Sequence, residues 1–220
     1  MTMNYGTLHV KCFVCNMVEE NTYVLWDDTH EAVIVDCGAF YDREKQDLAD
    51  FVEREGLVLK HLLNTHGHFD HIFGNQFIRE QYDLLPELSW DETDTYLVAA
   101  EQMRMFMHRE IPLDVPPIGN TLVENDEVRF GAHRLKVIAT PGHTAGGICF
   151  YCEEEGVLLS GDSLFRSCIG RCDLPGGNEQ LLVRGLKEKV LTLPENVVVL
   201  PGHGPSTTVL REKQGNPYLY

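Results

Sequence analysis

The chain has 220 residues, 43% of them hydrophobic, which is enough for one sizeable core and favours a single domain. Its formal net charge of −16 repels phosphate backbones and disfavours nucleic-acid binding. No run of 18 apolar residues occurs, and the first residues lack an apolar signal segment, so we expect a cytoplasmic protein without a membrane segment.

The first half of the chain alternates strand-like and helix-like patterns. Short β-rich runs separated by polar residues predict antiparallel strands over 8–15, 21–26 and 32–36. Residues 41–56 carry apolar residues at helical spacing and end in Gly56, which predicts a helix with a natural stop. A buried strand is expected next, and then two further helices, over 57–64, 72–82 and 93–110.

A second β-rich half follows a loop marked by prolines 112, 116 and 117. Its expected strands are 121–124, 127–130, 133–139, 147–152 and 157–160. A glycine-rich loop (170–177), a helix near 179–190, a strand at 196–200 and a short helix near 206–214 complete the chain. Two such halves predict an α+β fold, a four-layer αβ/βα sandwich, as a single domain over residues 1–220.

Seven cysteines are scattered along the chain, an odd number that suits reduced thiols better than a disulfide framework. Two CxxC pairs, Cys12 with Cys15 and Cys149 with Cys152, lie inside strand-like runs. A redox motif and a shared four-cysteine zinc site are the alternatives, but both motifs favour turns or helix starts. We interpret these cysteines as buried structural thiols.

Four segments carry metal-ligand residues directly after strand-like runs. "THGHFDH" supplies His66, His68, Asp70 and His71, and the other three segments supply one residue each: "TPGHTAGG" has His143, "LLSGDSLF" has Asp162 and "VVVLPGHG" has His203. Strand ends that face one way bring distant residues to one rim, and glycine permits the tight turns this requires.

Seven candidate ligands exceed the four of one tetrahedral ion and suit two ions. Isolated histidines are better read as surface or core residues, which applies to His9, His30, His61, His108 and His133. Packing alone is a poor explanation for the crowded segment, because buried polar groups need partners. The pattern therefore predicts a catalytic centre with two divalent metals, zinc first, with iron or manganese as alternatives.

The four segments resemble, in order and spacing, the signature segments of the metallo-β-lactamase superfamily. The resemblance implies that fold and a division of the ligands. One metal would take His66, His68 and His143; the other would take Asp70, His71 and His203; Asp162 would bridge them. The true β-lactamases of the best-known class have a cysteine where this chain has Asp162, which disfavours lactam hydrolysis.

Within the superfamily the chain is similar to the glyoxalase II group, the hydroxyacylglutathione hydrolases. "EENTYVLWDD" (19–28) resembles the opening of that group, and "GDSLFRSCIGRCDLPGGN" resembles its compact bacterial branch. The C-terminal helical domain that helps the longer enzymes bind glutathione is expected to be absent. Where those enzymes place a lysine and a tyrosine against glutathione, this chain has Arg171 and Asp173.

The resemblance implies hydrolysis of a small thioester such as S-lactoylglutathione by a hydroxide that bridges the metals. Asp70 would be catalytic as well as a ligand, orienting the hydroxide, and Arg171 would bind an anionic part of the substrate. A mono-iron persulfide dioxygenase of the same superfamily is the main alternative. A nuclease and a non-enzymatic metal-binding protein are further rivals, and we predict neither a nucleic-acid nor a membrane partner.

Overall fold

The computed structural model describes residues 2–108 and 112–220, and there the strands form two large mixed sheets. The first sheet has the strand order β1-β2-β3-β4-β5-β6-β7. Its strands are β1 (Thr2–Tyr5), β2 (Leu8–Cys15), β3 (Glu20–Trp26), β4 (Glu31–Val35), β5 (Val58–Leu63), β6 (Pro86–Ser89) and β7 (Asn120–Leu122). The strands β1 to β4 pair antiparallel, and β4 to β7 pair parallel.

The second sheet has the strand order β15-β14-β11-β10-β9-β8. Its strands are β8 (Glu127–Phe130), β9 (His133–Ala139), β10 (Ile148–Cys152), β11 (Val157–Gly161), β14 (Val198–Pro201) and β15 (Thr207–Thr208). Only β11 and β14 pair in parallel in this sheet, as far as the described strands go. The short strands β12 (Leu164–Phe165) and β13 (Cys168–Ile169) form a separate hairpin.

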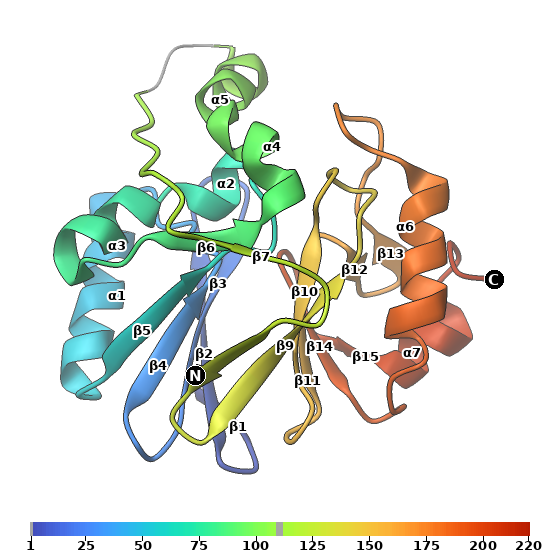
Figure 1. The fold of residues 1–220 in the computed structure, drawn as a ribbon, viewed down its shortest axis with the longest axis horizontal. Helices are drawn as coiled ribbons and strands as arrows, with labels where there is room; N and C mark the ends of the chain where they lie inside the picture. Colours follow the sequence, from blue (N-terminus) through green and yellow to red (C-terminus); the bar gives the residue numbers. More distant parts are fainter. Residues whose placement is uncertain (1, 109–111) are drawn as a thin grey trace.

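Helices cover the outer faces of both sheets (Figure 1). The first sheet is covered by α1 (Asp42–Arg54) and α3 (Asn75–Tyr82), and the second by α6 (Glu179–Gly185) and α7 (Val209–Gly215). The short helices α2 (Phe69–Ile72), α4 (Thr93–Leu97) and α5 (Ala99–Met107) lie near one end of the strands. The predicted four-layer αβ/βα sandwich is confirmed.

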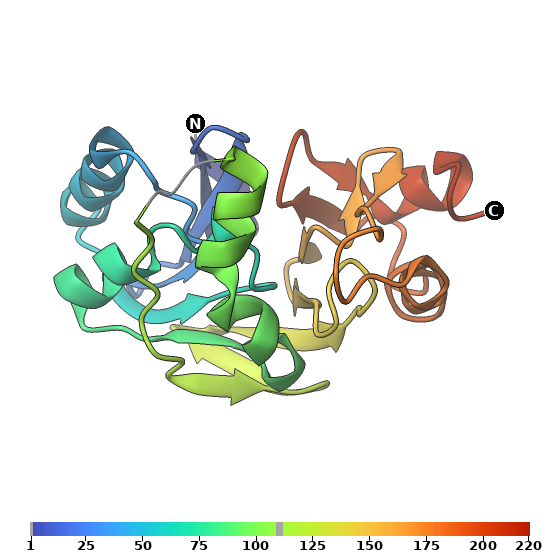
Figure 2. The same ribbon diagram turned by 90° about the horizontal axis from the view of Figure 1, so that it is seen from above.

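Alternation along the strands builds the central core. In β4, Val33 and Val35 face the second sheet, whereas Ala32 and Ile34 face the helix layer. Side chains of a strand alternate between the two faces of a sheet, so a strand covered on both faces must be apolar throughout. Figure 2 shows the two halves of the chain side by side, each with its own outer helices.

Most predicted elements are present, with differences at breaks and edges. The predicted helix 72–82 is two helices, α2 and α3, because the chain turns at Gly74, whose N–H donates to Cys37 O at 2.7 Å. The predicted helix 93–110 is broken at Val98 between α4 and α5, and its last residues, 109 and 110, lie outside the described residues. The helix near 179–190 ends as a π-helical turn, η2 (Leu186–Val190).

Short strands were missed where the periodicity had too few residues to show. These are β1, β6, β12, β13 and β15, of two to four residues each. The methionines after residue 102 do not act alike: Met103 is fully buried, whereas Met105 is 69% exposed. Packing in the core therefore accounts for Met103 and not for Met105.

Both CxxC pairs lie inside strands, β2 and β10, as predicted. A separation of three residues on a strand sends the two side chains to opposite faces. Cys12 and Cys152 pack in the core between the sheets, whereas Cys15 and Cys149 pack under the outer helices. Among the described residues, none of the groups with metal-ligand spacing includes a cysteine. This arrangement supports structural thiols.

No helix in the described parts of the chain is long and apolar enough to cross a membrane.

Candidate metal centre

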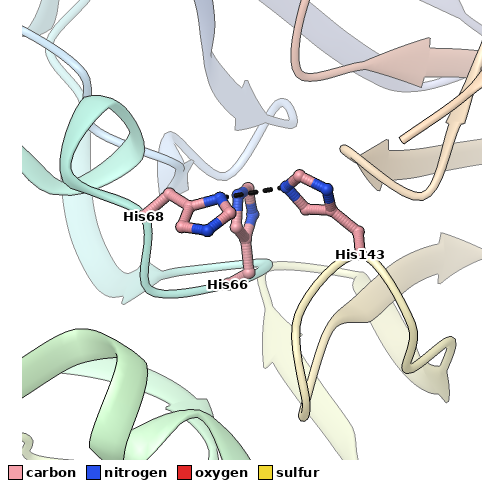
Figure 3. A group of neighbouring side chains, drawn as sticks. All are labelled: His66, His68 and His143. Carbon is pink, nitrogen blue, oxygen red and sulfur yellow. Dashed lines mark hydrogen bonds between the residues drawn. The ribbon is translucent and has the colours of Figure 1, made fainter. Parts of the chain in front are cut away.

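The first group of candidate ligands consists of His66, His68 and His143, called here the three-histidine group. Figure 3 shows their rings turned toward one another from two different loops. His66 and His68 follow β5, and His143 follows β9. His68 Nδ1 and His143 Nε2 are 2.9 Å apart, and one ligand atom from each of the three lies within 4.8 Å of the others.

The second group consists of Asp70, His71 and His203, called here the mixed group. Asp70 Oδ2 lies 3.2 Å from His203 Nε2 and 3.7 Å from His71 Nε2. Asp70 and His71 belong to α2, and His203 follows β14, where its backbone forms a bridge to Glu20 at the start of β3. The two groups are the two ligand sets that the sequence resemblance implied.

Asp162 lies between the two groups, directly after β11. Its Oδ1 is 3.3 Å from His71 Nε2, and its Oδ2 is 3.6 Å from His143 Nε2 and 3.7 Å from His203 Nε2. One carboxylate therefore reaches ligand atoms of both groups, as a bridging ligand must. Gly202 makes room for it, because a Cβ at that position would collide with the Asp162 carboxylate.

The residues present fit a pair of metal ions. Two ligands of one tetrahedral ion with bonds of about 2.1 Å are about 3.4 Å apart, and the separations here run from 2.9 to 3.7 Å. Three buried ligand atoms have no hydrogen-bond partner within the described chain: His66 Nε2, His71 Nε2 and Asp162 Oδ1. Orphaned buried polar atoms are costly, and two cations, one at each group, would satisfy all three.

The outward-facing nitrogens of four ligand histidines are held by acceptors. His143 Nδ1 lies 2.7 Å from Arg171 O, and His203 Nδ1 lies 3.1 Å from Val18 O. His71 Nδ1 lies 3.1 Å from an oxygen of Asp36, and His66 Nδ1 lies 3.0 Å from the Thr65 hydroxyl. An N–H donated outward leaves the lone pair on Nε2, which then points into the site as a ligand.

Burial and neighbouring charges adjust the pKa values of the histidines. Burial lowers the pKa of His66 well below its usual value and that of His68 to about 4. Both imidazoles are therefore neutral near pH 7, the form that binds metals. At His71 burial also acts to lower the pKa, but the charges of Asp162 and Asp70 outweigh it and raise the pKa well above normal. The two carboxylates therefore stabilise positive charge at the centre.

Two buried carboxylates beside the centre escaped the sequence analysis. Asp36 accepts hydrogen bonds from the Thr65 N–H and hydroxyl, both at 2.7 Å, as well as facing His71. Its backbone is left-handed, with φ at 52°. Glu20 is fully buried, accepts from the Thr22 hydroxyl at 2.8 Å and, with Asp36 and His71, forms a further group of ligand atoms within 4.8 Å. Burial raises the pKa of Glu20 well above its usual value.

A local signal for one of these two existed. Asp36 ends the apolar run "AVIV" in the same way that Asp162 ends "VLLSG", so the strand-end pattern could have found it. Glu20 lies within "VEEN", where no sequence pattern distinguishes it from neighbouring acidic residues.

Arg171 lies on the loop whose carbonyl holds His143, at the edge of the centre. Its guanidinium donates two hydrogen bonds of 2.8 Å to the carboxylate of Asp173, and both side chains are more than half exposed. Hydrogen bonding from Arg171 lowers the pKa of Asp173 to about 2. The positive charge predicted to meet an anionic substrate is therefore engaged by its own neighbour.

Two of the isolated histidines, His61 and His133, pair with carboxylates away from the metal centre. His61 contacts the Glu87 carboxylate at the edge of the first sheet, and Glu87 raises the pKa of His61. His133 is buried between Asp27, at 3.1 Å, and Glu155, at 3.3 Å.

Comparison with protein families decides the wider assignment. The sequence profile of the metallo-beta-lactamase superfamily matches residues 17–203. The chain belongs to the metallo-β-lactamase superfamily. Together with the cluster of histidines and carboxylates, this membership makes it a metallo-hydrolase.

Curated relatives match this superfamily member over nearly its whole length. It is 36% identical to the probable metallo-hydrolase YqgX of Bacillus subtilis over 202 residues, which covers 92% of the chain and 93% of the relative. It is 32% identical to the hydroxyacylglutathione hydrolase GloC of Haemophilus influenzae over 221 residues, with 99% and 98% covered.

Solved structures agree with the fold of this superfamily member. The B3 metallo-beta-lactamase BLEG-1 has a TM-score of 0.87 at 35% identity, with 96% of this chain and 99% of that chain covered. TTHA1623, solved in a di-iron-bound form, has a TM-score of 0.83 at 32% identity, with 95% and 100% covered. ETHE1 from Myxococcus xanthus has a TM-score of 0.76 at 27% identity, with 94% and 83% covered.

Proposed function

We propose that the chain hydrolyses small thioesters of the S-lactoylglutathione type at a centre of two divalent metal ions. The three-histidine group would hold one ion, the mixed group would hold the other, and Asp162 would touch both. The observation that carries the proposal is the position of Asp162, whose two oxygens face ligand atoms of both groups. The thioester class is supported by the end-to-end similarity to GloC of Haemophilus influenzae.

Two ions held in this way would supply a nucleophilic water of lowered pKa and polarise the substrate carbonyl. Asp70 would orient the attacking water, since its carboxylate lies at the partly open side of the mixed group with 12% of its side chain exposed. A thiolate is a good leaving group, so the chain needs no strong general acid to complete the reaction. Zinc is the proposed metal, with iron or manganese as alternatives, because imidazole and carboxylate ligands accept all three.

Arg171 is the proposed binding residue for an anionic part of the substrate. Its guanidinium would have to bind the substrate carboxylate in place of Asp173, or hydrogen-bond to both carboxylates at once. The competition predicts weak binding of anionic thioesters, expressed in KM rather than in kcat. The catalytic groups do not depend on this ion pair, so neutral thioesters would react with little change.

A panel of thioesters tests the substrate class and the role of Arg171 together. Metal-loaded protein is assayed with S-lactoylglutathione and with neutral thioesters, for the wild type, Arg171→Ala and Asp173→Asn. We expect Arg171→Ala to raise KM for the anionic substrate alone. Asp173→Asn should lower it, because the amide no longer neutralises the guanidinium. Equal effects on anionic and neutral substrates would remove Arg171 from substrate binding.

Thioester turnover, oxygen uptake and lactam turnover together separate the competing activities. Protein that contains two equivalents of metal but hydrolyses no thioester would contradict the proposal. Oxygen uptake with glutathione persulfide, at one equivalent of iron, would assign the chain to the persulfide dioxygenase alternative. Turnover of a chromogenic cephalosporin would show that the similarity to BLEG-1 extends to lactams.

A further inference from the structure

Glu92 is a buried carboxylate that no ligand pattern in the sequence points to. It ends η1 (Trp90–Glu92), a 3-10 turn that leads into α4, and none of its surface is exposed. The turn begins at Ser89, whose side chain accepts a hydrogen bond from the Asp91 N–H. Burial raises the pKa of Glu92. A carboxylate in such a position needs hydrogen-bond donors, and its donors are backbone N–H groups.

The two oxygens of Glu92 bind two different loops. The Gly67 N–H donates to Oε2 at 2.8 Å, and the Gly146 N–H donates to Oε1 at 2.7 Å. Gly67 lies between His66 and His68, and Gly146 lies three residues after His143. One side chain therefore joins the loops that carry all three members of the three-histidine group.

The packing around these glycines shows that the contact is closely fitted. A Cβ at Gly67 would lie 2.6 Å from the Tyr96 N atom, and a Cβ at Gly146 would lie 2.6 Å from the Glu92 N atom. Only glycine lets the backbone of this segment approach both loops so closely. Tyr96 is itself fully buried, and its hydroxyl donates to Pro116 O at 2.7 Å, which holds the segment in place.

Among the described residues, one further backbone bond joins the bases of the two loops, where the Ile148 N–H donates to Thr65 O at 2.9 Å. One bond at the base leaves two loops free to turn about it, whereas a second bond farther along fixes their relative orientation. We propose that Glu92 is a positioning residue that holds His66 and His68 against His143 by tying the backbones of their loops. This role rests on the metal centre proposed above.

The consequence is an effect on one metal and not on both. Ligand atoms must be held within about 0.5 Å for tight binding, and the 2.9 Å between His68 Nδ1 and His143 Nε2 depends on the relation between the two loops. The mixed group depends less on this relation, because Asp70 and His71 share α2 and His203 is supported by Val18. Loss of the Glu92 bonds should therefore weaken the ion at the three-histidine group selectively.

The test compares Glu92→Gln with Glu212→Gln. Glutamine keeps the size of the side chain but presents an NH2 group to one of the two N–H donors. Glu212, on α7, is an equally buried carboxylate, 1% exposed, and it accepts a hydrogen bond from the Ser167 N–H at 2.8 Å. Glu212→Gln therefore controls for loss of stability alone. Metal-free proteins are titrated with Zn²⁺ against a chromogenic chelator, and anomalous diffraction at limiting zinc assigns each dissociation constant to its group.

We expect Glu92→Gln to weaken zinc binding at the three-histidine group at least tenfold, which corresponds to about 1.4 kcal/mol. Binding at the mixed group should change less than threefold, and Glu212→Gln should leave both unchanged. If Glu92→Gln binds zinc at the three-histidine group as tightly as the wild type does, the positioning role is overturned. It is also overturned if zinc binding weakens equally at both groups. Wild-type protein that binds no zinc overturns the proposed function itself, and the positioning role falls with it.

Amide hydrogen exchange of the folded wild type gives a second measurement that needs no variant to fold. The Gly67 and Gly146 amides should exchange as slowly as the Ile148 amide, within tenfold, because all three are bonded at the junction of the loops. Exchange of either glycine at the rate of an exposed loop amide overturns the proposal even if Glu92→Gln cannot be purified in folded form.

Discussion

Replacing Asp36 by asparagine tests whether the buried carboxylate behind His71 organises the metal centre. Asp36 accepts three hydrogen bonds, two from Thr65 and one from His71 Nδ1. Asparagine has the same shape but only one acceptor oxygen. If that oxygen keeps the Thr65 N–H, the amide NH2 faces the His71 N–H, and two donors then oppose each other.

The expected cost follows from these contacts. A hydrogen bond to a charged group contributes about 1.5–3 kcal/mol, and the variant loses one such bond and weakens the other two. We therefore expect the free energy of unfolding of the metal-free protein to fall by about 3 kcal/mol. His71 can escape the clash by moving its proton to Nε2, but this removes the lone pair that faces the mixed group. Loss of such an outer partner weakens metal binding about 10–100-fold.

Guanidinium denaturation of the metal-free protein measures the first effect, and chelator competition measures the second. Asp28→Asn is the control, because the Asp28 side chain is 90% exposed and its substitution should change stability by no more than about 0.5 kcal/mol. If Asp36→Asn unfolded within 0.5 kcal/mol of the wild type and kept its metal affinity, the reasoning about this buried carboxylate would be refuted.

Three other predictions concern the bridging carboxylate, the cysteines and acid stability. Asp162→Ala should lower the affinity for both metals and the turnover rate by more than about 100-fold, the upper effect of losing an outer hydrogen-bond partner of a ligand. Metal analysis and kinetics measure this, and loss of one metal alone would contradict the bridging role. Cys12→Ser and Cys15→Ser should leave metal content and turnover unchanged, and loss of a metal equivalent from either would refute the structural role. Burial raises the pKa of Asp27, but hydrogen bonds, chiefly from the Thr29 hydroxyl, lower it to about 2, below the usual 3.8. Because the folded pKa is the lower one, its stabilisation of about 2 kcal/mol is present above pH 4 and is lost as the pH falls to 2. Asp27→Asn should remove this pH dependence in denaturation curves at pH 2 and pH 5, and an unchanged slope would count against it.

Local patterns in the sequence were sufficient for the layers and for the candidate ligands. Alternating apolar residues mark strands such as β9, and helical spacing marks α1, because each pattern is complete within a few residues. The segment from His66 to His71 is equally local. The residues after the other strands could be placed with it because strands that run in the same direction end at the same rim of the fold. Strands of two residues, such as β12, carry too short a pattern to be seen.

Contacts between distant residues were decided only by tertiary packing. Asp36 meets His71 across 35 positions, and Glu92 meets Gly146 across 54. Asp36 follows an apolar run that marks it as a strand-end residue, but the sequence neighbours of Glu92 do not distinguish it from acidic residues at the surface. Arg171 was recognised by its charge, but its pairing with Asp173 depends on how the loop turns. A side chain's type and its neighbours in sequence specify what chemistry it can perform. Which donors it meets, and therefore which of its possible roles it takes, depends on where the two sheets bring its loop.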